Sequence, residues 1–294
     1  MTSQLDTLTQ INLDDLVNAF GWQKRPLLAS MLRRLFIKPA HRFAQQILDF
    51  DSIIARRGLV EASRLTQQYY VRDIRVFNSD RVPASGFLAL SNHPGMTDTL
   101  SLFCVLQRND LKIIALNRPF LKSLPNLSKH LFFVTDDPYE RVTLVRHVSR
   151  HLRAGGAALT FPAGHTEPDP DTYSGAVESL QSWLDSVGVF IRLAPEMAVL
   201  PIVVRSVIWD KIAHHPIIRT KRTKDERELL AVAFQLLAHV MFNIKPVIVK
   251  VQIGKPITAH ELGTTDTQII RHAVAAEMKQ LFENPPEGEG ISAL

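Results

Sequence analysis

From residue 70 to about residue 253, short apolar runs alternate with segments whose apolar residues recur at helical spacing. Such short runs, rich in Val, Ile, Leu and Phe, are typical of strands. We expect strands at 74–77, 87–90, 112–115, 132–134, 157–161, 199–204 and 247–253, and helices at 99–106, 141–153 and 177–186. Strands that alternate with helices predict an α/β fold, with a mixed sheet flanked by helices.

The first 70 residues lack this alternation. Their apolar residues follow helical spacing, and Pro26 and Pro39 are expected to divide them into several short helices, because proline ends or kinks a helix. We therefore predict a helical N-terminal segment over 1–70 and an α/β domain over 71–294. The tail at 284–290, rich in Pro, Gly and Glu, is expected to fray.

Composition narrows the class of protein. A single cysteine, Cys104, excludes an internal disulfide and a Cys-rich zinc site, and its apolar surroundings predict a buried thiol. The net charge of +5 favours anionic partners such as membrane headgroups or phosphorylated substrates. No signal peptide is expected, since no basic start precedes an apolar run. The longest uncharged apolar stretch, 229–244, is shorter than the roughly 20 residues of a spanning helix, so no membrane span is predicted.

Several motifs of other protein classes do not occur in the chain. There is no GxSxG nucleophile elbow, no GxxxxGK phosphate loop and no HExxH zinc motif. The pair His214-His215 has no third ligand at a useful spacing, so we expect it in a solvated loop. The basic run at 219–227 has no interleaved aromatic residues, which sets nucleic-acid binding aside.

The segment with the clearest chemistry is Ser91-Asn92-His93-Pro94-Gly95-Met96-Thr97-Asp98, directly after the apolar run at 87–90. Active sites of open α/β sheets lie at the carboxyl ends of strands. His93 is the natural general base, because its pKa lies near the working pH. Asp98 follows where a helix should begin, and its carboxylate is expected to orient the imidazole. The alternative is that His93 only packs at the strand end.

This block resembles the first motif of the glycerolipid acyltransferase superfamily, which shows Asn-His-x4-Asp after a strand. Three further blocks resemble the family's other motifs, in the family's order. They are Ala115 to Leu121 with Arg118, Gly155-Gly156 followed by Phe161-Pro162-Ala163-Gly164-His165, and Val199 to Val203 with Pro201. The four blocks together span about residues 71 to 255.

The chain also departs from the family it resembles. Ala163 stands where the family carries Glu, and His165 stands where it carries Thr. Two acids, at 136–137, lie near the position where the family typically has an Arg that binds phosphate. Arg118, Arg141 or His165 would then supply the positive charge that a phosphate needs. Whether the acceptor is phosphorylated therefore stays open.

The resemblance implies an O-acyltransferase that moves a fatty acyl group from acyl-CoA or acyl carrier protein to a hydroxyl of a glycerol-phosphate or lysophospholipid acceptor. His93 would be the general base, oriented by Asp98, with no metal, cofactor or covalent nucleophile. Backbone N–H groups near Gly95 or Gly164 would stabilise the oxyanion. The residues that this implies at the substrate are Asn92, Gly95, Arg118, Phe161, Pro162, Gly164, His165 and Pro201.

Three alternatives stand beside this interpretation: a non-phosphorylated hydroxy-lipid acceptor, a weakly active relative that binds lipid at a membrane surface, and a hydrolase that uses the same base on water. Residues 16–48 contain six Lys and Arg, no acids and several large apolar side chains. Such a segment either docks on an anionic membrane or packs on the catalytic domain. Docking would make the protein cytoplasmic and peripheral at the inner face of the membrane. No oligomeric state is predicted.

Overall fold

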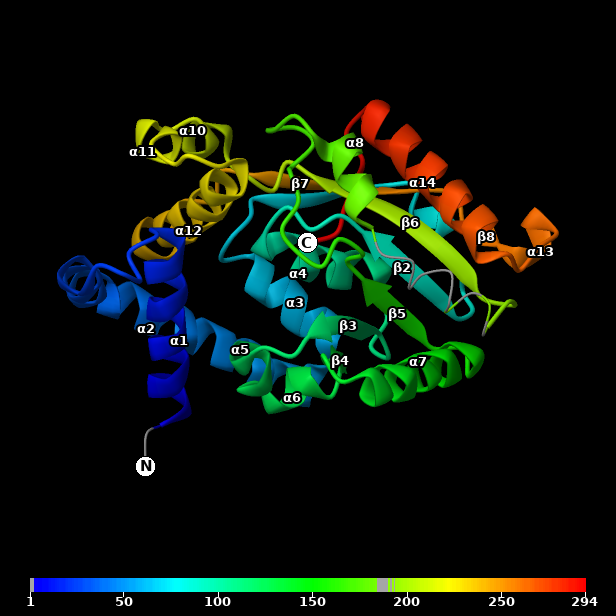
Figure 1. The fold of residues 1–294 in the computed structure, drawn as a ribbon, viewed down its shortest axis with the longest axis horizontal. Helices are drawn as coiled ribbons and strands as arrows, with labels where there is room; N and C mark the ends of the chain where they lie inside the picture. Colours follow the sequence, from blue (N-terminus) through cyan, green and yellow to red (C-terminus); the bar gives the residue numbers. More distant parts are fainter. Residues whose placement is uncertain (1–2, 184–189, 191, 193) are drawn as a thin grey trace.

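The computed structural model describes residues 3–183, 190, 192 and 194–294, and shows a central sheet with helices on both faces (Figure 1). The strand order is β4-β3-β5-β2-β6-β7-β1-β9, and β8 pairs with β6 beside this path. The strands are β1 (Asp73–Phe77), β2 (Phe87–Ser91), β3 (Lys112–Leu116), β4 (Leu131–Val134), β5 (Ala157–Thr160), β6 (Ala198–Arg205), β7 (Ile248–Ile253), β8 (Ile257–Thr258) and β9 (Ile291–Ser292). The predicted α/β fold with a mixed sheet is confirmed.

Strand direction decides where the functional residues meet. Strands β4, β3, β5, β2 and β6 run parallel, and β6 pairs antiparallel with β7. The carboxyl ends of these five strands therefore lie along one edge of the sheet, which we call the catalytic edge. Segments that follow β2, β3, β5 and β6 are far apart in the sequence and come together there.

Alternate residues of the strands point to opposite faces of the sheet and belong to two hydrophobic cores, one on each face. In β2, Phe87 and Ala89 belong to one core, and Leu88 and Leu90 belong to the other. The first core is covered by helices from the N-terminal segment together with α4 and α12, and the second by α7, α8 and α14. The helices are α1 (Gln4–Ala19), α2 (Pro26–Arg57), α3 (Leu59–Gln67), α4 (Met96–Leu106), α5 (Pro119–Lys122), α6 (Pro125–Ser128), α7 (Pro138–Arg153), α8 (Ala176–Ser179), α10 (Asp210–Ala213), α11 (Pro216–Arg219), α12 (Lys224–Phe242), α13 (Ala259–Leu262) and α14 (Thr267–Glu283).

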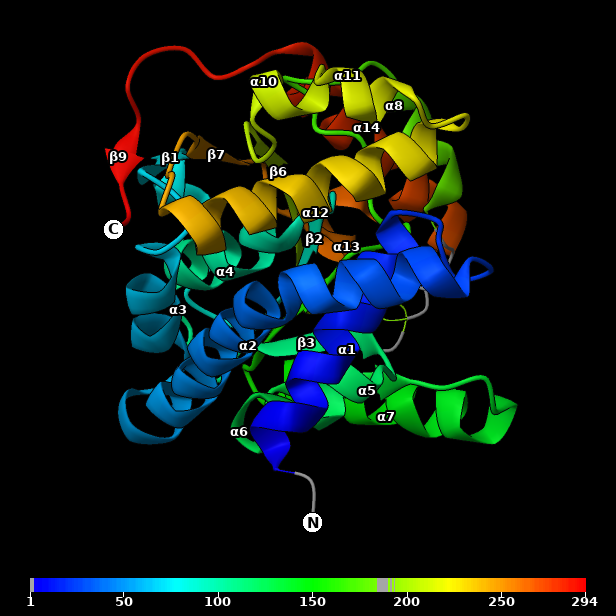
Figure 2. The ribbon, with the colours of Figure 1, turned by 90° about the vertical axis from the view of Figure 1, so that its left-hand side faces the viewer.

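Helix α2 corrects the expectation of several short helices. Pro26 does begin a helix, but α2 then continues for 32 residues through Pro39. The carbonyl that Pro39 deprives of a partner belongs to Leu35, on the solvent-exposed side of the helix, where water can bond it. Helices α2 and α12 lie side by side on one flank of the molecule (Figure 2).

The N-terminal helices are fastened to the α/β part by buried polar groups. The Asp51 carboxylate of α2 accepts hydrogen bonds from the N–H groups of Asn126 and Leu127 at 3.0 and 2.7 Å. The Gln67 amide of α3 donates to the Thr97 carbonyl and to the Ser101 hydroxyl, both at 2.7 Å. Because α4 carries Asp98, this segment also helps to position the catalytic edge.

The tail at 284–290 forms no helix or strand, but the chain is held just beyond it: β9 pairs antiparallel with β1, and the Ser292 hydroxyl donates to Asp73 at 2.7 Å. The helix expected at 177–186 ends early, because α8 stops at Ser179 and a 3-10 turn follows over Leu180–Ser182. The last part of that range, 184–186, lies outside the described residues.

Within the described parts of the chain, no helix combines the length and the apolar character needed to cross a membrane.

Candidate active site

The catalytic edge gathers most of the residues singled out in the sequence. Asn92 and His93 follow β2 directly, Phe161 follows β5, and Arg118 follows β3 by two residues. Since β3, β5 and β2 are neighbours in the sheet, these three strand ends lie next to one another. The site is therefore built by topology, as the position of the motif predicted.

Asn92 ties the end of β2 to β6. Its side-chain amide donates to the Val204 carbonyl at 2.8 Å, and its side-chain oxygen accepts from the Val204 N–H at 2.8 Å. The side chain thereby continues the parallel ladder by one step after the backbone has left the sheet. The backbone directly before His93 is consequently held in place.

His93 and Asp98 form the expected pair. The Nδ1 atom of His93 lies 2.9 Å from Oδ2 of Asp98, whose side chain is 0% exposed. Asp98 is the third residue of α4, and it also accepts hydrogen bonds from the Gly95 N–H at 2.8 Å and the Thr99 hydroxyl at 2.9 Å. The carboxylate is thus fixed against the backbone of Gly95, the N-cap residue of α4, while it holds the imidazole.

The environment keeps His93 basic. Burial lowers the pKa of His93, but the charge of Asp98 and its hydrogen bond raise it, with a smaller contribution from Glu167, so the net pKa lies above the ordinary value. The Asp98 contact occupies Nδ1, and among the described residues no group bonds Nε2. The side chain is 31% exposed, so Nε2 is the nitrogen left to meet a substrate.

Phe161 forms one wall of the site. Its ring stacks on the His93 imidazole, with centroids 4.5 Å apart and planes inclined by 27°. Pro162, the next residue, is buried and carries the chain away from β5. The aromatic stack and the Asp98 bond together hold the imidazole plane.

Arg118 is a cation whose charge acts on His93 and lowers the pKa of its ring. It is exposed at the N-terminus of α5, and its charge acts on both His93 and Asp15 of α1. Burial raises the pKa of Asp15, and the Arg118 charge partly opposes this. A guanidinium at this position is suited to an anionic group on a substrate.

Other residues implied at the substrate are placed differently. The Gly95 N–H donates to Asp98, and the Gly164 N–H donates to the Phe161 carbonyl at 3.0 Å, so neither is free for an oxyanion. His165 is exposed, and its ring bonds the Ala163 carbonyl. Pro201 is buried inside β6, where its carbonyl accepts from the Gly254 N–H at 2.8 Å. Pro201 therefore shapes the sheet rather than touching a substrate.

The acids at 136–137 do not face the site. Asp136 points fully into solvent beside Arg141, at 3.5 Å, and Asp137 caps α7 by accepting from the Tyr139 N–H at 2.7 Å. The repulsion of a phosphate that the sequence suggested therefore does not arise from them. Arg141 is committed to this turn as well, since it also donates to the Thr135 carbonyl.

Sequence reasoning missed two buried acids, Glu167 and Asp169. Glu167 bonds the backbone of His93, and Asp169 accepts from the backbone N–H groups of Ser206, Val207 and Ile208, which follow β6. The signal was present as Glu-Pro-Asp-Pro at 167–170, just after the third motif. An acid missing at Ala163 could have prompted a search for another nearby.

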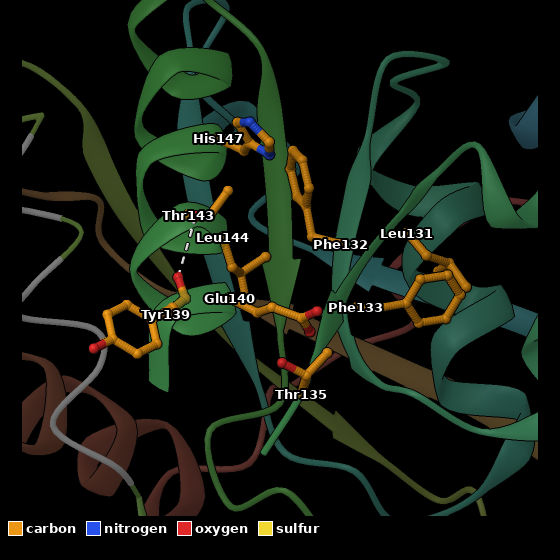
Figure 3. Close-up of a pocket in the computed structure, with 9 residues that line it drawn as sticks. All are labelled: Leu131, Phe132, Phe133, Thr135, Tyr139, Glu140, Thr143, Leu144 and His147. Carbon is orange, nitrogen blue, oxygen red and sulfur yellow. Dashed lines mark hydrogen bonds between the residues drawn. The ribbon is translucent and has the colours of Figure 1, made fainter. Parts of the chain in front are cut away.

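A cavity of about 380 Å³ lies between edge strand β4 and helix α7, away from His93 (Figure 3). Phe132, Leu144 and His147 are among its lining residues.

In the described part of the chain no group of three His, Cys, Asp or Glu residues is arranged to hold a metal ion. Cys104 is buried in α4 as predicted, and burial raises its pKa to about 12, which makes it a poor nucleophile.

Comparison with known proteins agrees with this geometry. The family model described as Acyltransferase matches residues 73–205, a range that holds His93, Asp98, Arg118 and Phe161. No curated protein matches the chain. Among solved structures, the crystal structure of the 1-acyl-sn-glycerophosphate (LPA) acyltransferase PlsC from Thermotoga maritima is similar, with 16% identity and a TM-score of 0.45, over 95% of this chain and 98% of that one.

The assignment of class rests on the family match, since the structural likeness is too low to carry it. Residues 73–205 match the Acyltransferase family, which agrees with the acyltransferase motifs of the sequence and supports an acyltransferase enzyme.

Proposed function

We propose that the protein transfers a fatty acyl group from a thioester, acyl-CoA or acyl carrier protein, to a hydroxyl of a glycerol-phosphate or lysophospholipid acceptor. The acceptor oxygen attacks the thioester carbonyl carbon, and Nε2 of His93 takes the hydroxyl proton. A C–O bond forms, the C–S bond breaks, and the leaving thiolate receives the proton from His93. Asp98 stabilises the imidazolium between these two steps.

The observation that carries this proposal is the arrangement of His93 itself. Nδ1 is held at 2.9 Å by a fully buried carboxylate, while no described residue bonds Nε2 at the catalytic edge. A histidine that only packs at a strand end needs neither a buried carboxylate on one nitrogen nor a partly exposed ring. The pair therefore supports catalysis over lipid binding alone.

Arg118 supports a phosphorylated acceptor. It is exposed and its charge acts on His93, while Asp136 pairs with Arg141 and Asp137 caps α7. A guanidinium can bond two phosphate oxygens at once, which would orient the acceptor hydroxyl toward His93. The similar protein from Thermotoga maritima is described as acting on 1-acyl-sn-glycerophosphate, a phosphorylated acceptor.

We also propose that the protein docks on the inner face of an anionic membrane through α2. Leu27, Met31 and Leu35 recur at one helical face and are 86%, 54% and 67% exposed. Arg34 and Lys38 are exposed beside them. The packing alternative holds for other residues of this segment, because Phe20, Trp22 and Phe36 pack against buried Leu16, Val17 and Leu32. The outward row is suited to the headgroup region.

The test is product analysis with labelled palmitoyl-CoA or palmitoyl carrier protein and four acceptors: glycerol-3-phosphate, lysophosphatidic acid, monoacylglycerol and none. The proposal predicts acylated product with a phosphorylated acceptor and little label released without one. Product from monoacylglycerol alone would favour the neutral hydroxy-lipid acceptor. Free palmitate whatever the acceptor would indicate a hydrolase, and lipid binding without product would indicate an inactive relative.

A further inference from the structure

One buried acid at the catalytic edge has no part in the proton transfer. We infer that Glu167 is a positioning residue for the proposed acyl transfer: it clamps the backbone of His93 from both sides and places a second negative charge near the ring. The inference rests on the proposed function. Glu167 lies in the loop that follows β5, four residues beyond Ala163, and its carboxylate contacts the His93 backbone.

The clamp is reciprocal. The Glu167 N–H donates to the His93 carbonyl at 2.9 Å, and the His93 N–H donates to Oε2 of Glu167 at 3.2 Å. Both polar groups of the His93 main chain are thereby paired with one residue. The side chain of His93 then has its position fixed from the backbone outward, before Asp98 and Phe161 set the ring.

Glu167 can hold this position because its other oxygen is also engaged. Oε1 accepts from the Ser179 hydroxyl at 2.9 Å and from the Trp183 indole N–H at 3.0 Å, and the residue is only 1% exposed. Burial raises the pKa of Glu167 above its ordinary value, and the bonds from Trp183, Ser179 and His93 oppose this rise. The N–H donors of Trp183 and His93, one at each oxygen, favour the ionised carboxylate.

The loop that carries Glu167 is itself anchored. Two residues further on, Asp169 accepts from the N–H groups of Val207 and Ile208 at 2.6 and 2.8 Å. The ends of β5, β2 and β6 are therefore joined through one loop, and Glu167 cannot swing away without breaking these bonds. A free surface side chain in this position could not orient a neighbour.

Three charged groups from different elements act on the His93 ring. Asp98 of α4 and Glu167 of this loop favour the imidazolium, and Arg118, after β3, disfavours it. Removing the charge of Glu167 should therefore lower the pKa of His93. A purely structural glutamate would affect stability without moving the pH dependence of the reaction, which separates the two roles.

The first test is Glu167→Gln, assayed at a temperature where circular dichroism shows the variant folded. The Gln side chain has one accepting oxygen instead of two, so its NH2 group must face the N–H donor of either Trp183 or His93. We expect kcat to fall about 10- to 100-fold, with little change in KM for the thioester. The midpoint of the pH profile of kcat/KM should move to lower pH.

The second test is the double variant Trp183→Phe with Glu167→Gln. Without the indole N–H, the Gln NH2 can point at the Ser179 oxygen while its carbonyl accepts from the His93 N–H. The positioning role predicts that kcat recovers toward that of Trp183→Phe alone, while the pH midpoint stays low because the charge is absent. A double variant no faster than Glu167→Gln would contradict the clamp.

The inference is overturned if Glu167→Gln retains the wild-type kcat and pH midpoint while His93→Ala is inactive. In that outcome the proposed function stands and only the clamp fails. If His93→Ala and Glu167→Gln are both as active as the wild type, the proposed function fails with it. A lower melting temperature with unchanged kcat and midpoint would make Glu167 merely structural.

Discussion

The side chain of Asn92 and the backbone of Val204 exchange two hydrogen bonds, each 2.8 Å long. Both groups are fully buried, and the pair takes the place of a strand-to-strand ladder at the point where β2 gives way to the catalytic loop. An asparagine is suited to this role because its amide carries a donor and an acceptor side by side, as a peptide group does. The presence of asparagine directly before His93 is therefore explained by its geometry.

Replacing Asn92 by Ala should destabilise the protein. The substitution leaves the N–H and the carbonyl of Val204 buried without partners, each at a cost of about 1–3 kcal/mol. Urea unfolding should show a lower midpoint. Asn117→Ala is the matched control, since Asn117 is exposed and should leave the midpoint unchanged. Equal midpoints for both variants would show that the pair contributes nothing to stability.

The rate should depend on pH through His93. The base must be neutral to accept a proton, so kcat/KM should rise with pH, with a midpoint above about 6.5, the ordinary value for histidine. Burial lowers the pKa of His93, but the charge and hydrogen bond of Asp98, together with the charge of Glu167, raise it above that value. In Asp98→Asn the midpoint should move to lower pH, and the plateau should fall because the ring loses its orientation. An unchanged midpoint in Asp98→Asn would contradict the coupling.

Arg118 should determine affinity for a phosphorylated acceptor. Hydrogen bonds to a charged group contribute about 1.5–3 kcal/mol, so Arg118→Ala should raise KM for lysophosphatidic acid about 10- to 100-fold. KM for the thioester should change little. Lys122→Ala is the control, because Lys122 is exposed on the same short helix α5. If both variants change KM equally, the effect is one of general charge rather than of a clamp.

Membrane docking should depend on the outward row of α2. Replacing Leu27, Met31 and Leu35 by Ser removes apolar area that water already contacts, so folding should be preserved. In flotation with vesicles of anionic phospholipid, the triple variant should no longer float with the vesicles. A control with Val142 and Ile269, which are exposed on α7 and α14, changed to Ser should still float with them. Changing Arg34 and Lys38 to Gln should weaken binding by about 1 kcal/mol each. If the triple variant floats as the wild type does, this face of α2 is not the membrane-docking surface.

Much of the fold could be predicted from periodicity alone. The expected strands at 87–90 and 112–115 each lie within one residue of an observed strand, because buried strands leave uninterrupted apolar runs. The passage of α2 through Pro39 could not be predicted, since it depends on which side of the helix faces water. Nor could the pairing of β9 with β1, because two residues at a chain end carry no periodicity.

The site shows the same division. His93 and Asp98 could be paired from sequence because a strand followed by a helix brings positions five apart together. Glu167 lies 74 residues from His93 in the chain, and its contact depends on β5 lying next to β2. The commitment of the Gly95 N–H to Asp98 likewise depends on the first turn of α4. Local spacing predicts local pairs, whereas contacts between strand ends need the strand order.

The central claim is that His93 is the general base of an acyl transfer. The most direct measurement is the turnover of labelled palmitoyl-CoA with lysophosphatidic acid by the wild type, by His93→Ala and by the exposed control His214→Ala. We expect His93→Ala to stay folded and to lose about 10²–10⁴-fold in kcat, while His214→Ala keeps the wild-type rate. A folded His93→Ala variant with near-normal transfer would contradict it.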